Sequence, residues 1–398
     1  MARIPGAGPT AAAPGAPRPP ATMISAPAPA DGPSAGAPML RTKNDPSGIT
    51  VLGTFANCSG GTTPWGTVLS GEENFQGYFR TSGAFPPDKR YGLQDKATTY
   101  GWEEVDARFD ARGAGHETEP NRFGWIVELD PFRPDEPPVK HTALGRFKHE
   151  GANVMVGRSG HVAAYMGDDE RFDYVYRFVS RNRMRSGTGS GARAHNKTLL
   201  SQGSLYVARF TGNSPADQID GSGSLPADGA FDGTGEWLPI VVDGFSHVPG
   251  FSAEQALVCG DPADPGTYFA GFPRDRVAPI SCPDNIAFDS RGDLWIATDG
   301  APSTLGHCDG LFHMPLSGRD RGHLRQFLAV PREAETCGPV IRDAEGTVLV
   351  AVQHPGEDGT FADQHSFFPD YVADGAAPAP GQWRGPRPSV VQVWRDRD

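Results

Sequence analysis

Short runs of alternating apolar and polar residues recur along the chain, and each follows a polar turn that contains glycine. The clearest runs cover residues 161–165, 294–297 and 348–352. Alternation with a period of two is typical of β-strands that bury one face, so we predict that these runs are the inner strands of propeller blades. The turn glycines Gly292 and Gly346 are 346 − 292 = 54 residues apart, close to the roughly 40 to 50 residues of known blade repeats.

The composition supports the same fold class. The 398 residues include 51 Gly and 38 Pro, with 37% hydrophobic residues, which favours short strands joined by turns over long helices. We therefore expect an all-β fold, a β-propeller with irregular loop excursions, over residues 39–398. Residues 1–38 are rich in Ala, Pro and Gly and are expected to be disordered, and residues 213–235 are expected to form a loop.

Charge and hydropathy exclude several classes of partner. The net charge of −12 is spread over interleaved acidic and basic residues, which argues against nucleic-acid binding. No apolar run is long enough to span a membrane, and we expect a monomer. The first thirty or so residues lack the features of a signal peptide and have no twin-arginine pair.

The stretch over residues 57–75, NCSGGTTPWGTVLSGEENF, combines a thiol, a glycine-rich turn and two carboxylates. The turn can fold Glu72 and Glu73 back toward the sulfur of Cys58. A thiolate is a ligand for a transition metal, whereas paired carboxylates favour Ca²⁺, so the stretch suggests a mixed-metal site. A buried free cysteine beside two solvated glutamates explains the same residues equally well. The chain has five cysteines and no Cys-x-x-Cys pair, so at least one thiol is free or metal-bound.

Other acidic residues occur where predicted strands begin or end, as metal ligands often do. Glu150 and Asp284 each precede a predicted strand, and Asp169 follows one. We predict that Asp169 binds metal while Asp168 or Glu170 is held by Arg171; ordinary turn carboxylates are the alternative in each case. Cys282 and His354 are expected to have structural roles.

Several of these segments occur together in a known family. The chain resembles the PhoX-type calcium-dependent alkaline phosphatases in the block after Cys58 and, in the same order, in residues 121–131, 145–152, 165–171, 282–285, 294–299, 337–339 and 352–355. The resemblance implies an enzyme that hydrolyses small phosphate monoesters at alkaline pH. It also implies Fe³⁺ and Ca²⁺ cofactors and export to the periplasm or medium. The metal ligands that we predict are Cys58, Glu72, Glu73, Glu150, Asp169, Asp284 and Glu335; Glu335 is included on the resemblance alone.

One family motif is missing. The resemblance implies an Arg-Pro-Glu sequence whose Arg grips phosphate and whose Glu binds metal, and none occurs in this chain. Blades are therefore expected to be incomplete, and Arg274, Arg276 or Lys148 would have to replace the missing Arg. Two alternatives stay open: a non-catalytic calcium-binding propeller, and a calcium-dependent propeller hydrolase that acts on lactones.

Overall fold

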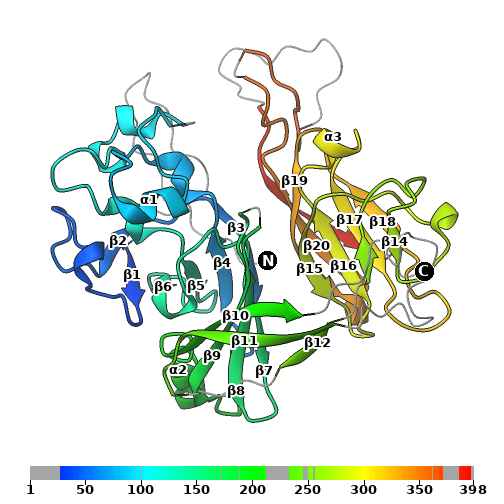
Figure 1. Cartoon of the computed structure of the whole chain (residues 1–398), viewed down its shortest axis with the longest axis horizontal. Coiled ribbons are helices and arrows are strands. Elements are labelled where there is room, and N and C mark those ends of the chain that lie inside the picture. Colours follow the sequence, from blue (N-terminus) through cyan, green and yellow to red (C-terminus); the bar gives the residue numbers. More distant parts are fainter. Residues whose placement is uncertain are drawn as a thin grey trace.

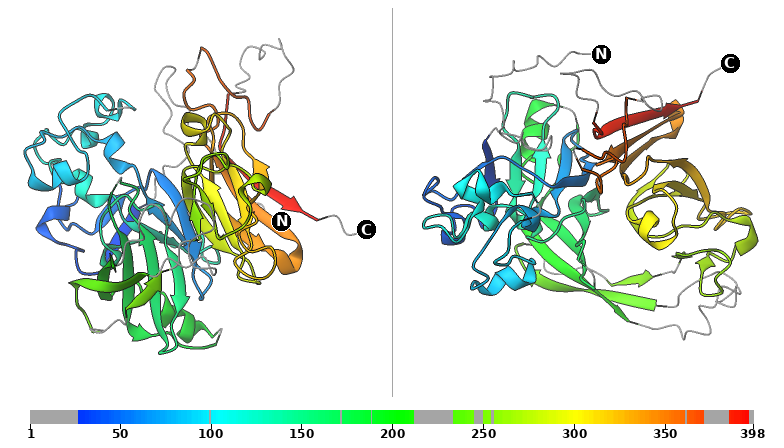
Figure 2. Two further views of the ribbon diagram at one scale, coloured as in Figure 1. Left: turned by 45° about the vertical axis from the view of Figure 1, so that its right-hand side comes forward. Right: turned by 90° about the horizontal axis from the view of Figure 1, so that it is seen from above.

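The computed structural model describes residues 27–98, 100–170, 172–187, 189–211, 233–244, 250–253, 256–360, 362–370 and 385–395. Within this part of the chain, four sheets of three or more strands surround a common centre in a propeller-like arrangement of four blades (Figures 1 and 2). The predicted all-β propeller is therefore confirmed. None of the described helices has the length and apolar character needed to cross a membrane.

The first two blades are the larger ones, with six strands each. The first has the order β2-β1-β6-β5-β4-β3, from β2 (Thr50–Leu52), β1 (Pro27–Asp31), β6 (Val139–His141), β5 (Ile126–Leu129), β4 (Val68–Glu72) and β3 (Asn57–Thr62). The second has the order β12-β11-β10-β9-β8-β7, from β12 (Phe251–Ala253), β11 (Gly233–Val241), β10 (Gly203–Thr211), β9 (Val175–Arg183), β8 (His161–Gly167) and β7 (Asn153–Val156). Most of the predicted loop over residues 213–235 lies outside the described residues.

The other two blades are smaller, and short elements join them. The third is β15 (Pro283–Phe288), β16 (Leu294–Thr298), β17 (Gly310–Met314) and β18 (Arg325–Ala329); the fourth is β19 (Glu335–Arg342), β20 (Thr347–Gln353) and β21 (Ser389–Trp394). A two-stranded hairpin, β13 (Leu257–Val258) and β14 (Tyr268–Phe269), precedes the third blade. The α-helices are short: α1 (Pro86–Arg90), α2 (Ser190–Asn196) and α3 (Ala301–Thr304).

The innermost strands are not the ones that the alternation predicted. Strand β3 contacts both β7 and β19, and β19 contacts β15, so these four strands surround the centre. The alternating runs form β8, β16 and β20, which are the second strands of their blades. The prediction was wrong because the inner strands carry polar site residues and irregular pairing, which conceal the period of two.

The folded part begins before the predicted boundary at residue 39. Strand β1 pairs with β2 in antiparallel fashion and with β6 in parallel fashion, and Ala28 and Ala30 are buried in the core. Residues 27–38 are therefore ordered, contrary to the expectation of disorder up to residue 38. Their small side chains allow burial between two strands even though their composition is that of a linker. Residues 1–26 lie outside the described part of the chain.

Candidate metal centre

The predicted site residues gather at one end of the innermost strands. Each blade contributes a donor at or shortly before the start of its inner strand: Cys58 on β3, Glu150 before β7, Asp284 on β15 and Glu335 on β19. In each blade the second strand runs antiparallel to the inner strand, so it ends beside the start of the inner strand. One further residue of each blade lies just past the end of this second strand: Glu73 after β4, Asp169 after β8, Asp299 after β16 and His354 after β20. The four blades thus converge on one cluster by repeating the same arrangement.

Irregular strand pairing directs these side chains toward the centre. The register shifts at the site in three inner strands, between Asn57 and Gly60, between Pro283 and Ile286, and between Cys337 and Val340. Bulges of this kind occur next to active sites, where they re-aim a side chain. Cys58 and Asp284 lie inside two of these shifts, and Cys337 lies at the edge of the third.

The glycine pair after Cys58 allows the close approach of neighbouring strands. A Cβ atom on Gly60 would lie 1.7 Å from the carbonyl oxygen of Leu69, and one on Gly61 would lie 2.2 Å from that of Ala152. Neither position has room for a side chain, because the backbones of β4 and of the segment before β7 press against β3. These two glycines lie in β3 and not in the predicted turn, and their lack of a side chain lets Cys58 approach Glu150.

The donor atoms lie within reach of shared cations. The thiol of Cys58 donates to Oε1 of Glu150 at 2.6 Å, and its sulfur lies 3.6 Å from Oε1 of Glu335 and 3.5 Å from the sulfur of Cys337. Ligand atoms of three overlapping groups lie within 4.8 Å of one another: Cys58 with Glu73 and Glu150, Glu150 with Asp284 and Glu335, and Cys58 with Glu335 and Cys337.

Amide side chains hold the carboxylates in place. The amide nitrogen of Asn285 donates to Glu150 at 3.0 Å and to Asp284 at 2.8 Å, while its oxygen accepts from the backbone N–H of Gly338 at 2.6 Å. Gln353 donates to Oε2 of Glu335 at 2.7 Å. These contacts fix the orientation of donors that come from three different blades.

The negative charges of the clustered carboxylates repel one another, and bound cations would relieve this repulsion. Burial, followed by the charges of neighbouring carboxylates, raises the pKa values of Glu73 and Asp284. Burial also raises the pKa of Glu150, although the hydrogen bond from Cys58 opposes this. So many carboxylates cannot all be charged together unless cations compensate them. Sulfur suits a transition metal and carboxylate oxygen suits Ca²⁺, so the donor set fits both kinds of ion.

Glu72 does not belong to the cluster, so its prediction as a ligand was wrong. Its side chain is fully buried and faces the interior of the first blade, where Lys140 lies 2.6 Å away and Thr54 donates at 2.8 Å. The backbone N–H groups of Gly124 and Trp125 donate to its other oxygen. Successive residues of an extended chain point to opposite sides, so Glu72 and Glu73 cannot both reach Cys58.

The two aspartates after β8 have different surroundings, and the role of Asp169 as a metal ligand stays a prediction. Asp169 lies close enough to Glu73 at the cluster to help raise the pKa of that carboxyl group. Asp168 instead pairs with Arg90 at 2.6 Å, and Glu170 pairs with Lys148. Arg171, which we expected to hold one of these carboxylates, lies outside the described residues.

Two residues at the cluster had no predicted role as ligands. Cys337 is buried, and its position two residues after Glu335 on the same strand was the available sequence signal. Asp299 follows β16, and burial together with the charge of Glu335 raises its pKa to about 7. Their place in the cluster depends on contacts between blades, which the sequence does not reveal.

His354, predicted to be structural, is a basic side chain that contacts the cluster. Its Nε2 lies 3.1 Å from Glu335 and its Nδ1 lies 3.0 Å from Glu357. Burial lowers its pKa, but the hydrogen bond with Glu335 and the nearby acidic charges outweigh this and raise the pKa to about 9. The three candidates to replace the missing Arg have other partners: Arg274 donates to the backbone carbonyl of Asp264, Arg276 lies over the ring of Phe272, and Lys148 pairs with Glu170.

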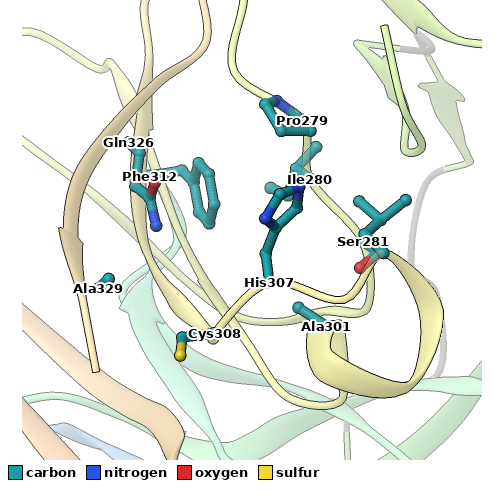
Figure 3. Close-up of a pocket in the computed structure, with 10 residues that line it drawn as sticks. Pro279, Ile280, Ser281, Ala301, His307, Cys308, Phe312, Gln326 and Ala329 are labelled. Carbon is teal, nitrogen blue, oxygen red and sulfur yellow. The ribbon is translucent and has the colours of Figure 1, made fainter. Parts of the chain in front are cut away.

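A pocket of about 280 Å³ lies at the same end of the third blade, beside α3 (Figure 3). Its walls combine apolar side chains with His307, Cys308 and Gln326. None of the predicted metal ligands lines it, so the pocket is distinct from the cluster. The pocket and the cluster are close in the sequence, because Ser281 lines the pocket and lies three residues before Asp284.

Comparisons with known proteins identify the family of the chain. A family model described as alkaline phosphatase PhoX matches residues 24–254 and 245–356. The solved structure of Pseudomonas fluorescens PhoX in complex with vanadate, a transition state analogue, is similar, with a TM-score of 0.74 and 29% sequence identity over 93% of this chain and 75% of that chain. No curated protein matches the chain at a significant level. The resemblance noted from the sequence motifs is therefore confirmed.

Proposed function

Because the chain belongs to the PhoX alkaline phosphatase family and is a phosphatase, we propose that it hydrolyses small phosphate monoesters at alkaline pH through an iron–calcium centre. The observation that carries this proposal is the cluster of one thiol pair and several partly or fully buried carboxylates contributed by all four blades. The reaction class and the identity of the ions are proposed from the family resemblance, and the chemistry of the donors is compatible with both kinds of ion.

The two kinds of donor would hold two kinds of ion. Cys58 would hold the iron, while Glu73, Glu150, Asp284 and Asp169 would hold calcium. When bound, such cations neutralise the phosphoryl oxygens and lower the cost of expelling the leaving group.

The protein's own contribution is to position these ligands. Asn285 fixes the relative orientation of Glu150 and Asp284 through its two hydrogen bonds, and its contact with Gly338 ties the third blade to the fourth. Gln353 orients Glu335 in the same way. Such contacts around metal ligands typically change metal affinity or activity about 10–100-fold when removed.

A second candidate function follows from the missing Arg-Pro-Glu sequence. Without a replacement for its Arg, the same cluster would bind calcium and stabilise the propeller but would not turn over substrate. The lactone-hydrolase alternative is less suitable, because a thiolate is a poor ligand for a site that holds only calcium.

The proposal is tested by the hydrolysis of p-nitrophenyl phosphate at alkaline pH. We expect turnover with calcium, a loss of at least about tenfold with a chelator, and recovery when calcium is restored. Vanadate should inhibit, because the structurally similar Pseudomonas fluorescens PhoX was solved in complex with it as a transition state analogue. Glu150→Gln should lose activity, and the exposed Glu345→Gln is the matched control. A folded, metal-loaded protein without turnover would favour the non-catalytic calcium-binding propeller.

A further inference from the structure

Cys337 lies beside Cys58, with 3.5 Å between the two sulfur atoms. The two cysteines come from the inner strands of the fourth and first blades, β19 and β3, which contact each other. Cys337 is only 3% exposed. The sulfur atoms are farther apart than the roughly 2.05 Å of a disulfide, so both are free thiols that face one point.

The distances match those of ligands that share one ion. Two thiolate sulfurs that each lie about 2.3 Å from a tetrahedral ion are about 3.8 Å apart. A carboxylate oxygen that lies about 2.1 Å from the same ion is about 3.6 Å from each of these sulfurs. The observed separations are 3.5 Å between the sulfurs and 3.6 Å from Cys58 to Oε1 of Glu335. Only a small adjustment of the side chains is needed to bind a cation.

The local structure supports a third ligand from the same strand. Glu335 and Cys337 are two residues apart on β19, so their side chains share one face. Gln353 on the neighbouring β20 donates to Glu335 at 2.7 Å and lies 3.5 Å from the sulfur of Cys58. The amide thus contacts two of the three donors and holds them together.

We propose that Cys58 and Cys337 together bind one thiophilic transition-metal ion, with Glu335 as a third ligand. The ion replaces the thiol protons, including the one that Cys58 donates to Glu150. Glu73, Glu150 and Asp284 then remain available for hard cations such as Ca²⁺. This inference rests on the metal-dependent site proposed above, but it does not depend on turnover.

Cobalt(II) is a suitable probe, because thiolate ligands give it a strong charge-transfer absorption in the near ultraviolet. We would add Co²⁺ to reduced, metal-free full-length protein. The band should fall to about half its intensity in Cys337→Ser and in Cys58→Ser, since each removes one of two thiolate ligands. It should disappear in the double variant. Cys308→Ser, at an exposed cysteine in the pocket of the third blade, is the matched control and should keep the full band.

A second measurement uses the unaltered protein, so that misfolding of a variant cannot decide the outcome. Alkylation over hours, long enough for local opening to expose the buried Cys337, followed by peptide mapping, should show that Co²⁺ slows the labelling of both Cys58 and Cys337 but not that of Cys308. A full-intensity band in Cys337→Ser, protection of Cys58 alone, or a Cys58–Cys337 disulfide in the metal-loaded protein would each overturn the inference. A two-thiolate spectrum without phosphatase activity would overturn only the proposed function.

Discussion

Replacing Glu72 by glutamine should destabilise the fold, whereas replacing its neighbour Glu73 should weaken cation binding. Glu72 and Lys140 form an ion pair at 2.6 Å in which both side chains are fully buried. Glutamine keeps the shape of Glu72 but removes the negative charge, so the ammonium group of Lys140 loses its counter-ion. Breaking a buried pair in this way costs about 3–5 kcal/mol.

We expect a loss of about 3 kcal/mol, at the lower end of this range, because Lys140 can release its proton. Burial lowers the pKa of Lys140 to about 8 even with Glu72 beside it. The difference from the wild type should therefore shrink as the pH rises from 7 toward 10, since the uncompensated charge is then lost in the variant.

Urea unfolding of the metal-free protein measures the effect on stability, and calorimetric titration with Ca²⁺ measures the effect on binding. Glu73→Gln removes one of several mutually repelling carboxylates, so its unfolding free energy should stay within about 0.5 kcal/mol of wild type. Its calcium affinity should fall at least about tenfold, because a direct ligand is lost. Normal stability with lost calcium binding in Glu72→Gln would refute the assignment, since Glu72 would then be the ligand.

Three further outcomes are expected. Asp130→Asn should lower the unfolding free energy at pH 7 by about 1.5–3 kcal/mol, because Arg193 binds both oxygens of Asp130 at 2.6 Å and holds its pKa well below the usual range. This difference should persist above about pH 4 and fade as the pH drops further, which urea unfolding at several pH values would show; a difference independent of pH would contradict it. Asn285→Ala should weaken calcium binding about 10–100-fold, because it frees Glu150 and Asp284, and unchanged calorimetric affinity would contradict that role. Calcium at about 100 times its Kd should raise the unfolding free energy by about 2.7 kcal/mol, and a melting temperature indifferent to chelator would show that the folded state does not bind it.

The fold class could be predicted from the sequence because the second strands of the blades carry an unbroken alternation. Strand β20, for example, has buried Val348, Val350 and Val352 at every other position. Strand β19 beside it reads ETCGPVIR, with two metal-binding residue types and a shift in register. Such a strand has no visible period, so its inner position could be recognised only after the sheets had assembled.

The candidate site was predictable where a residue lies at a strand end, and not where its fate depends on distant partners. Glu73, Glu150 and Asp284 needed only the local pattern and the family resemblance. Glu72 looked equivalent to Glu73, but its partner Lys140 lies 68 residues away in the sequence. Cys337 is 279 residues from Cys58, so their proximity depends on the closure of the propeller.

The central claim is that the cluster around Cys58 is the metal centre of a phosphatase. The most direct test measures the iron content and the rate of p-nitrophenyl phosphate hydrolysis in the same preparations of wild type and Cys58→Ala. We expect iron and calcium-dependent turnover in the wild type, and the loss of both iron and turnover in a variant that stays folded. A Cys58→Ala protein that retains its iron and its activity would contradict the account.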